Sequence, residues 1–372
     1  MVPDKPKVLV IARMAGAASA LAPVARILID DDFATPVVVG FEHAEPVFRE
    51  HELPLWAFEN SERMPEIVDQ IYENEQPKLV LTGTSAKPKL DLALWSHARA
   101  NNIPTVAVLD HWMNYSERFA DEQGSYRSAP DAIAVMDEVA YREMAASGCP
   151  TERLVVTGQP AFDEFTNLTP EREQQLRHLS LRELGVDEGE MLLVFASDPR
   201  AGRSLQLFLD AAQKSSMRLP NRLQVIVKLH PLETALVNDV VRRNRSFSVR
   251  ALRHFPQLKL IAAADLVVGM DSVLLLEAAL MGKRAISVQP SGAKPSRFLN
   301  HLHYLIERTQ DIKECEELIV GSLNEEKSAG QRRRELALAA GFDGKAGRRV
   351  GKLLYDRLGI APAVAEAHRN KV

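Results

Sequence analysis

The residues best suited to chemistry follow an apolar run in the second half of the chain. Asp271 and Ser272 come directly after the run Asp265–Met270, and the stretch from Ser272 to Met281 has the pattern of a helix. A serine hydroxyl and the free backbone N–H groups at the start of a helix favour an anion such as phosphate. Glu277, five residues further on, can accept hydrogen bonds from ribose hydroxyls. The alternative is that Asp271 or Ser272 only caps the helix and that Glu277 is solvated.

Three other apolar runs end in residues suited to a nucleotide. Lys228 and His230 lie at the end of a run that Pro231 terminates. Either side chain can donate to a phosphate oxygen, and the histidine can also move a proton. Ser197 and Gly158 end two further runs, and glycine lets the backbone come close to a ligand. A hydrogen-bonded edge histidine and a structural hinge at the glycine are the alternatives, and both stay open.

The first half contains a group of aromatic and polar residues after the run that ends at Leu109. Asp110 and His111 follow this run directly, and either can act as the general base that deprotonates an acceptor hydroxyl. Aromatic faces suit the apolar C–H faces of a sugar ring. The alternatives are a loop whose aromatic residues pack between the domains and, for Trp112 and Phe119 taken alone, positions in the core. The residues expected to bind the acceptor are Gly16, Thr84, Trp112, Tyr115 and Arg118.

Short apolar, β-branched runs alternate with longer amphipathic stretches along the chain. This alternation indicates a parallel sheet covered by helices on both faces. The pattern restarts after a helical stretch, so the sequence predicts an α/β protein with two Rossmann-like domains. The predicted strands are Lys7–Arg13, Pro36–Gly40, Lys78–Thr82, Thr105–Asp110, Ala132–Met136, Leu154–Gly158, Met191–Ser197, Leu223–Pro231, Asp265–Met270 and Arg284–Gln289. The predicted helices are Ala20–Leu28, Pro65–Tyr72, Leu90–Ala100, Glu138–Ala146, Pro170–Leu184, Ser204–Met217, Ser272–Met281 and Gly347–Leu358.

We expect three parts along the chain. Residues 1–158 form a domain that binds the acceptor, residues 159–345 form a domain that binds the nucleotide, and residues 346–372 form a closing helix and a frayed tail. Ligands in open α/β sheets bind at the carboxyl ends of the strands, so the two domains are expected to face each other across a cleft. Domain closure about Gly158–Pro160 would then assemble the site and exclude water.

The composition excludes several classes of protein. Hydrophobic residues make up 46% of the 372 residues, which is typical of a globular protein. The 46 basic and 50 acidic residues argue against a nucleic-acid partner. Two cysteines exclude a disulfide framework and fit a reducing compartment. No apolar run reaches the ~20 residues that span a bilayer, and the first residues are not a signal peptide, so a cytoplasmic location is expected.

No cofactor and no metal site are expected. Met14–Pro23, after the first apolar run, lacks the later glycines of the dinucleotide fingerprint, and no Walker A string is present. No cluster of metal ligands is visible. Two basic runs, Arg242–Arg253 and Arg332–Arg334, are explained best as solvated helix faces. Peripheral contact with an anionic membrane is the alternative, and a homodimer is left open.

Several of these segments together resemble a known superfamily. KLHPLE, ADLVVGMDSVLLLEAALMGKRAISV and TGQP followed by Asp163 resemble the GT-B superfamily of glycosyltransferases. Within it, the non-hydrolysing UDP-N-acetylglucosamine 2-epimerases have Asp-Ser-x-x-x-x-Glu at the spacing of Asp271, Ser272 and Glu277. Bacterial capsule and teichoic-acid transferases are also similar. The resemblance implies that His230 and Ser272 contact phosphate and that Glu277 contacts ribose.

The resemblance implies a glycosyltransferase that moves a sugar from a nucleotide-sugar donor to a saccharide or lipid-linked acceptor, in the biosynthesis of bacterial surface polysaccharide or glycoconjugates. The epimerases continue with Gly-Gly after the serine, whereas this chain has Val273 and Leu274, which favours the transferase branch. Two alternatives remain open. One is a nucleotide-sugar epimerase or hydrolase, and the other is a GT-B-like binding protein without catalytic activity.

Overall fold

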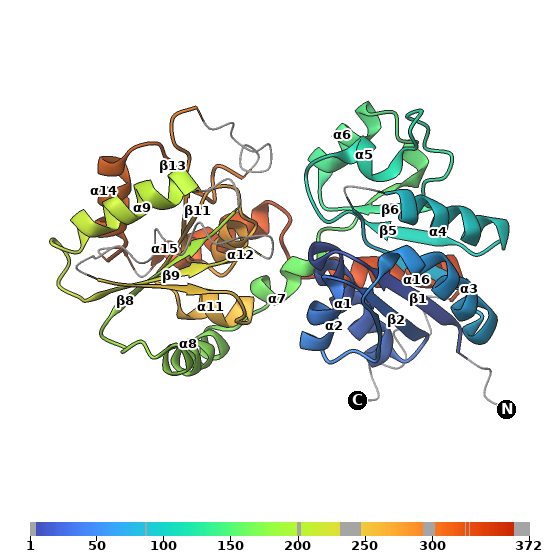
Figure 1. Cartoon of the computed structure of the whole chain (residues 1–372), viewed down its shortest axis with the longest axis horizontal. Helices are drawn as coiled ribbons and strands as arrows, with labels where there is room; N and C mark the ends of the chain where they lie inside the picture. Colours follow the sequence, from blue (N-terminus) through green and yellow to red (C-terminus); the bar gives the residue numbers. More distant parts are fainter. Residues whose placement is uncertain are drawn as a thin grey trace. The chain divides into compact units, whose positions relative to one another are not determined.

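The structure is a computed structural model that describes residues 5–85, 88–198, 202–230, 247–292, 302–323, 325–326 and 328–360. The chain forms two compact units. Unit 1 comprises Met1–Asp163 and Gly341–Val372, and unit 2 comprises Glu164–Ala340. Each unit has one parallel sheet flanked by helices (Figure 1). The fold is therefore α/β with two Rossmann-like domains, and its last helix returns to unit 1, as the sequence predicted.

Unit 1 is built on a seven-stranded sheet in the order β3-β2-β1-β4-β5-β6-β7. β1 lies between β2 and β4, with Val8 opposite Pro36 on one side and Leu79 on the other. The strand order reverses between β1 and β4, which is where open α/β sheets bind ligands. The strands are β1 (Lys7–Ala12), β2 (Thr35–Phe41), β3 (Leu55–Phe58), β4 (Leu79–Thr82), β5 (Thr105–Val108), β6 (Ala132–Val135) and β7 (Leu154–Val156).

Helices cover both faces of this sheet because its strands are apolar on both sides. α1 and α16 pack on one face, where Leu21, Leu28 and Val350 are fully buried. α3 and α4 lie over the other face, around Ile71 and Leu94. The helices are α1 (Ala15–Asp31), α2 (Ala44–Glu50), α3 (Met64–Glu75), α4 (Lys89–Ala100), α5 (Tyr115–Phe119), α6 (Glu138–Ala146) and α16 (Ala346–Leu358), with short 3-10 turns η1 (Ser61–Arg63), η2 (Thr151–Arg153) and η3 (Pro160–Phe162).

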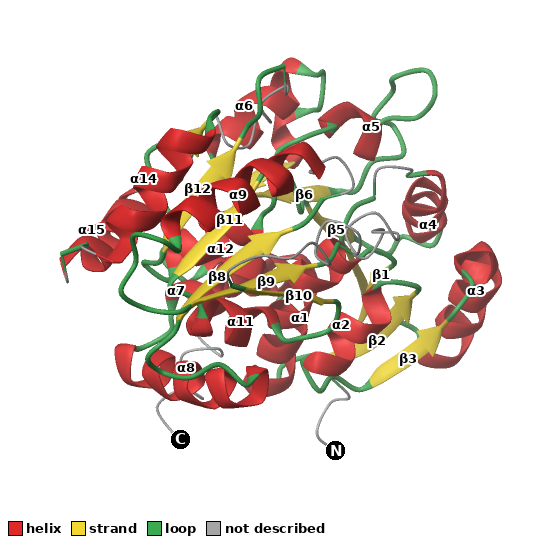
Figure 2. Ribbon diagram, turned by 60° about the vertical axis from the view of Figure 1, so that its left-hand side comes forward, coloured by secondary structure: helices red, strands yellow, loops and turns green. Residues whose placement is uncertain are grey.

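Unit 2 has a six-stranded sheet in the order β10-β9-β8-β11-β12-β13, with its reversal between β8 and β11. α9 and α14 cover one face, and α8 and α11 lie on the other (Figure 2). The strands are β8 (Met191–Ala196), β9 (Leu223–Lys228), β10 (Ser248–Leu252), β11 (Leu266–Gly269), β12 (Arg284–Val288) and β13 (Glu307–Thr309). The helices are α7 (Asp163–Thr166), which begins in unit 1, α8 (Pro170–Leu184), α9 (Gly202–Ser215), α11 (Gln257–Ala263), α12 (Leu274–Leu280), α14 (Ile312–Leu323) and α15 (Ser328–Ala339).

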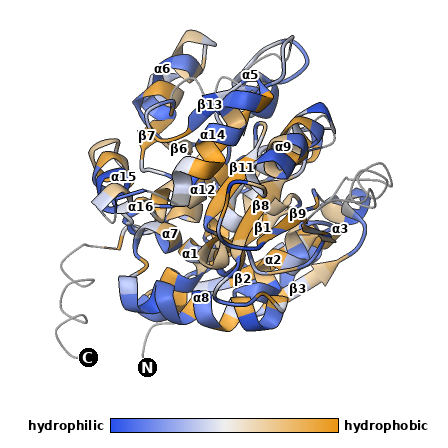
Figure 3. Ribbon diagram, turned by 90° about the vertical axis from the view of Figure 1, so that its left-hand side faces the viewer, coloured by the Kyte–Doolittle hydropathy of each residue, from blue (hydrophilic) through white to orange (hydrophobic). Residues whose placement is uncertain are grey.

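The hydropathy of the ribbon follows this layering. The strands are hydrophobic, and the helices carry hydrophilic residues on their outer faces (Figure 3). Burial of such apolar layers is the main source of stability in α/β domains. None of the helices within the described ranges is long and apolar enough to cross a membrane.

The structure confirms the predicted strands and helices with shifted ends, and it adds elements that the sequence analysis missed, among them β3, β10 and β13. The interpretation of Arg242–Arg253 as a helix face is wrong for Ser248–Leu252, which is a strand, while residues 242–246 lie outside the described residues. The run Arg332–Arg334 does lie on a helix, α15, where Arg333 binds Glu325 and Arg334 binds Glu173. The predicted tail after Ile360 also lies outside the described residues.

Candidate functional site

The carboxyl ends of β4 and β5 hold a buried ion pair. Arg118, on α5, donates from Nη1 to Asp110 Oδ1 at 2.6 Å and to Thr84 Oγ1 at 2.8 Å. Thr84 Oγ1 in turn donates to Asp110 Oδ1 at 2.5 Å. The side chains of Arg118 and Asp110 are only 8% and 12% exposed. Thr84 and Arg118, expected to bind an acceptor, therefore hold the Asp110 carboxylate in one orientation.

A second buried carboxylate, which the sequence analysis missed, lies nearby. Ser85 Oγ donates to Asp91 Oδ2 at 2.5 Å. Arg13, directly after β1, donates to Ser85 Oγ at 2.9 Å and lies 3.7 Å from Asp91 Oδ2. Burial raises the pKa of Asp91 above its ordinary value, while the hydrogen bond from Ser85 and the charge of Arg13 oppose that shift. Arg13 and Ser85 follow β1 and β4, the two strands at the reversal of strand order, and this placement was the available signal.

Gly16 allows α1 to begin directly against Asp110. A Cβ atom at Gly16 would lie 2.9 Å from Asp110 Oδ2, closer than such atoms approach in folded proteins. The space that the sequence analysis assigned to an acceptor at Gly16 is therefore filled by the carboxylate. Gly16 is required for the close packing of this strand-end cluster.

Trp112 and Tyr115 lie in the core of unit 1. Trp112 is 1% exposed, its Nε1 donates to Asp137 Oδ2 at 2.6 Å, and its ring stacks on Phe162 with ring centroids 6.0 Å apart. Tyr115 is 6% exposed. In this structure no ring face of Trp112 is open to a sugar, and its burial agrees with the alternative that Trp112 lies in the core. His111, between Asp110 and Trp112, is partly exposed.

Asp271 and Ser272 form the turn between β11 and α12. The helix begins at Leu274, two residues later than predicted, and Ser272 Oγ accepts a hydrogen bond from the Leu274 backbone N–H at 3.3 Å. The Ser272 carbonyl accepts from the N–H of Leu275 at 3.1 Å. Ser272 thus closes the turn that precedes α12, while the N-cap residue of the helix is Val273. Because a hydroxyl can accept and donate at once, Ser272 also keeps a proton to donate to a ligand.

A buried network that the sequence analysis missed holds this turn from the next strand. Ser287 Oγ and Gln289 Nε2 donate to the backbone carbonyl of Met270 at 2.7 and 2.8 Å. Gln289 Nε2 also donates to Asp271 Oδ1 at 3.1 Å. Both side chains are buried at the end of β12. Two polar residues in an otherwise apolar predicted strand were the signal, because buried polar groups require partners.

Glu277 is buried inside α12. Every residue of this helix is buried, and Glu277 is 6% exposed, so the alternative of a solvated residue is wrong. Gln257 Nε2 donates to Glu277 Oε2. Burial raises the pKa of Glu277 to about 8, while the hydrogen bond from Gln257 opposes the shift and the charge of Glu164 adds to it. At neutral pH Glu277 is therefore largely protonated, and it can donate as well as accept a hydrogen bond.

We expect Glu277 to make the protein less stable as the pH rises. Its pKa is about 8 in the folded chain against an ordinary value of 4.5. A raised folded-state pKa contributes stability that is fully present below the unfolded value and is lost as the pH rises through the folded value. Between pH 6 and pH 8 the free energy of unfolding should fall by about 2 kcal/mol through this group. Urea unfolding at pH 6, 7 and 8 measures the change. Glu277→Gln should remove it, and an unaltered pH dependence in that variant would contradict the assignment.

The ends of β8 and β9 bring Ser197 and Lys228 together. The backbone N–H of Ser197 donates to the carbonyl of Lys228 at 2.9 Å, and Lys228 Nζ donates to the carbonyl of Arg253 at 2.7 Å. Ser197 is 7% exposed and His230 is partly exposed. Ser197 follows β8 and Ser272 follows β11, the two strands at the reversal of order in unit 2. These residues therefore lie where such a sheet binds ligands.

Gly158 packs inside unit 1. Its φ of +85° is a left-handed conformation that favours glycine, and a Cβ atom there would lie 2.8 Å from Ala346 Cβ. The first turn of α16 thus packs against Gly158. The sequence analysis expected a nucleotide in that place. Asp163 also holds α16, because its Oδ1 and Oδ2 accept from the backbone N–H groups of Ala346 and Gly347 at 3.0 and 2.7 Å.

The structure brings the predicted residues together in two groups. In unit 1, Thr84, Asp110 and Arg118 are hydrogen-bonded to one another, and Gly16 lies against Asp110. In unit 2, Glu277 lies inside α12, and the other predicted residues follow or end the adjacent strands β9, β8 and β11. Among the residues in the described ranges, no three His, Cys, Asp or Glu side chains are arranged to hold a metal ion.

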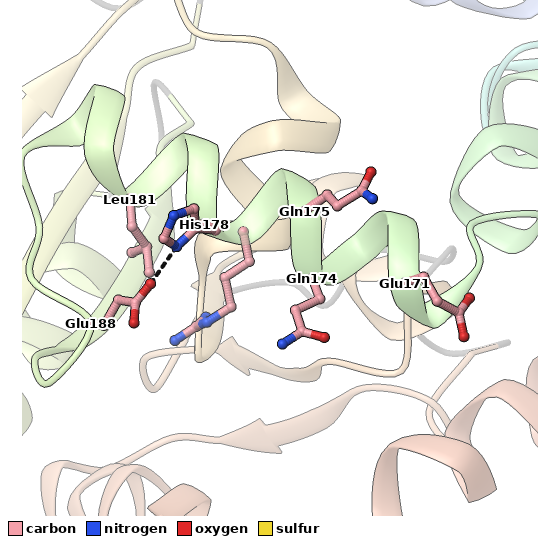
Figure 4. A pocket seen from close by; sticks show the side chains of 7 residues that line it. Glu171, Gln174, Gln175, His178, Leu181 and Glu188 are labelled. Carbon is pink, nitrogen blue, oxygen red and sulfur yellow. Dashed lines mark hydrogen bonds and ion pairs between the residues drawn. The ribbon is translucent and has the colours of Figure 1, made fainter.

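A surface pocket along α8 contains none of the predicted residues. Its side chains project from the helix, and His178 Nδ1 bonds to Glu188 Oε1 at its rim (Figure 4). The pocket is lined by Glu171, Gln174, Gln175, Arg177, His178, Leu181 and Glu188. It lies away from the carboxyl ends of the strands, so it is not the candidate site.

Comparison with solved structures defines the class of fold. The chain aligns with a UDP-N-acetylglucosamine 2-epimerase of Neisseria meningitidis bound to UDP-N-acetylglucosamine, at 13% identity and a TM-score of 0.67, over 95% of this chain and 99% of that chain. It aligns with Anabaena HepE in complex with UDP and glucose at 14% identity and a TM-score of 0.65, over 94% and 100% of the chains. A glycosyltransferase of Rickettsia africae aligns at 11% identity and a TM-score of 0.66, over 96% and 100%. The fold is that of the GT-B superfamily.

The sequence profile of UDP-N-acetylglucosamine 2-epimerase matches residues 126–354. The chain belongs to the UDP-N-acetylglucosamine 2-epimerase family. The matched range includes His230, Ser272 and Glu277, and it begins after Asp110 and His111. No curated protein sequence matches the chain significantly.

Proposed function

We propose that the protein binds a UDP-activated sugar through unit 2 and epimerises it at C2. The observation that carries this proposal is the family match over residues 126–354, which contain the Asp271–Ser272 turn and Glu277. Proteins of the same fold have been crystallised with UDP and with UDP-N-acetylglucosamine. The buried network on Met270 supports the same proposal, because a rigid turn presents its hydrogen-bond donors without reorganisation.

The diphosphate is proposed to lie at the Asp271–Ser272 turn. The hydroxyl of Ser272, which accepts from the Leu274 N–H, can also donate to the ligand, and the positive end of the dipole of α12 lies at the same end of the sheet. Lys228 and His230, at and just after the end of β9, two strands from β11, are proposed to supply further donors. Glu277, protonated or ionised, is proposed to bind ribose hydroxyls. Negative charge that develops on the diphosphate during the reaction is stabilised by these donors.

Unit 1 is proposed to supply the proton-transfer groups. Epimerisation at C2 removes the proton on that carbon while the C1–O bond breaks, so that a C1=C2 double bond forms and the nucleoside diphosphate leaves with the electron pair. A proton then returns to the opposite face of C2 as the diphosphate adds back to C1. Asp110 is held by Arg118 and Thr84, so we assign it a positioning role, and His111 is the group that moves the proton. Gly16 lets α1 approach this cluster closely.

Glycosyl transfer is the second candidate. It is favoured by Val273 and Leu274, which stand where the epimerases have two glycines. Leu274 is only 3% exposed, so the space beside the turn is filled with a side chain that those enzymes lack. In this case His111 would deprotonate the hydroxyl of a saccharide or lipid-linked acceptor, and the diphosphate would leave with the nucleotide.

Incubation with UDP-N-acetylglucosamine in D₂O, without an acceptor, tests the proposal. Proton NMR should show a second nucleotide sugar that differs at C2 and should show loss of the C2 proton signal as deuterium enters from solvent. A transferase would leave the donor unchanged until an acceptor is added. Binding of UDP with no turnover under either condition would support the third alternative, a binding protein without catalytic activity, and would overturn the proposal.

A further inference from the structure

Arg308 lies on the edge strand β13, on the same face of the sheet as α12. Ile286 and Val288 of β12 pack in the core beneath α9 and α14. Ser287, between them, therefore points to the opposite face, because side chains alternate along a strand. Arg308 is in register with Ser287, and residues in register on parallel strands share a face. Ser287 Oγ donates to the carbonyl of Met270, so Arg308 lies one strand beyond the network that holds the Asp271–Ser272 turn.

Arg308 is half-buried, and two of its three guanidinium nitrogens are out of contact with solvent. Its Nε and Nη2 atoms are buried and make no hydrogen bond in the described part of the chain. The neighbouring carboxylate, Glu307, binds Arg284 at 2.6 and 2.8 Å. A buried N–H group without an acceptor is unfavourable, because it loses its hydrogen bond to water. The buried Nε and Nη2 groups of Arg308 therefore do not stabilise the ligand-free fold.

A second unpartnered group lies on the same face. Gln289 Oε1 is buried and accepts no hydrogen bond within the described residues. Gln289 Nε2, by contrast, donates to the carbonyl of Met270 and to Asp271 Oδ1. Gln289 is two residues beyond Ser287, so it alternates onto the face of Arg308. Its backbone N–H donates to the carbonyl of Thr309, which directly follows Arg308, at 2.8 Å. Two buried donors and one buried acceptor therefore lie unsatisfied on adjacent strand ends.

We propose that Arg308 binds a phosphate oxygen of the nucleoside diphosphate and that Gln289 Oε1 accepts a hydrogen bond from a hydroxyl or N–H group of the same ligand. This inference rests on the proposed function, since it assigns two further binding residues to that nucleotide site. A planar guanidinium is suited to phosphate because its donors form a fork that matches two oxygens. The phosphate would supply the acceptor for Arg308, and the hydroxyl or N–H group would supply the donor for Gln289 Oε1.

The variant Arg308→Met tests this assignment, because it keeps an unbranched apolar stem and removes the guanidinium with its charge. Calorimetric titration with UDP should show a dissociation constant about ten- to hundredfold higher than that of the wild type. Affinity for uridine, which has no phosphate, should be unchanged. Arg308→Lys should lie between the two proteins, because it keeps the charge but loses the fork.

Thermal unfolding of the ligand-free protein separates a binding role from a structural one. Arg308→Met should unfold at the same temperature as the wild type or about 2–4 °C higher, because it removes two buried N–H groups that have no acceptor within the described residues. Arg218→Met is the matched control. Arg218 lies between α9 and β9, at the amino ends of the strands, and binds Glu316 and Glu317, so UDP affinity should not change in that variant.

Titration with pyrophosphate distinguishes failure of this inference from failure of the proposed function. If the wild type binds UDP and Arg308→Met binds it with equal affinity, the inference alone is overturned. The same holds if Arg308→Met unfolds at a lower temperature without losing affinity for UDP. The wild type could bind pyrophosphate but not UDP, with pyrophosphate binding lost in Arg308→Met. That result supports the anion site at Arg308 and overturns the proposal that the site binds a nucleotide. Binding of neither ligand overturns both.

Discussion

Replacing Arg118 with methionine is expected to lower the free energy of unfolding by about 3–5 kcal/mol. The substitution leaves the Asp110 carboxylate in its buried position without the guanidinium that binds it at 2.6 Å. It also removes the donor to Thr84 Oγ1 and to the carbonyl of Met113. Breaking a buried pair costs more than the pair contributes, because the remaining charge stays desolvated. Urea or thermal unfolding of the purified variant measures the loss.

Two further variants make this prediction specific. Arg118→Met combined with Asp110→Leu should recover much of the lost stability, because no unpaired charge remains. Arg49→Met is the exposed control. Arg49 pairs with Glu45 on the surface of α2, with side chains 62% and 30% exposed, so its loss should cost less than about 1 kcal/mol. Equal costs at Arg118 and Arg49 would contradict the description of a buried, mutually dependent cluster.

His111→Gln is expected to lower kcat by about 10²–10⁴-fold, with little change in the affinity for UDP. His111 follows β5 and is proposed to move the proton, whereas the nucleotide is proposed to bind through unit 2. Loss of a general base slows proton transfer in the transition state without removing the contacts to the diphosphate. The NMR assay gives kcat, and calorimetric titration with UDP gives the affinity.

The control for His111 is His43→Gln. His43 is an exposed residue that precedes α2, so its substitution should leave both quantities unchanged. A His111→Gln enzyme with wild-type turnover would remove His111 from the reaction. Proton transfer would then have to be assigned to Asp110 or to the cluster of Arg13, Ser85 and Asp91.

The strand ends were the part of the site that the sequence could predict. Asp110, Ser197, Lys228 and Asp271 each follow a continuous apolar run, and such runs mark the buried strands of a parallel sheet. Parallel strands all place their carboxyl ends at one edge, so residues far apart in the chain are expected there together. β10 and β13 were missed because they lack such an apolar run. Both are edge strands, and Arg250 and Glu307 are among their exposed or half-buried residues.

Which side chains point into the core could not be predicted from spacing alone. Trp112 has the composition of a sugar platform, but its packing on Phe162, fifty residues later, decides its burial. The pairing of Arg118 with Asp110 depends on the return of α5 against the ends of β4 and β5. Glu277 is an exception, because a helix that is apolar around its whole circumference is typical of a buried element, and that signal was present in Leu274–Leu280.

A crystal structure of the protein with UDP would test the central claim most directly. We expect the diphosphate within hydrogen-bonding distance of Ser272 Oγ, at the turn between β11 and α12, with the ribose toward Glu277. UDP bound at any other place on the chain, or a turn that stays without phosphate at saturating UDP, would contradict the account.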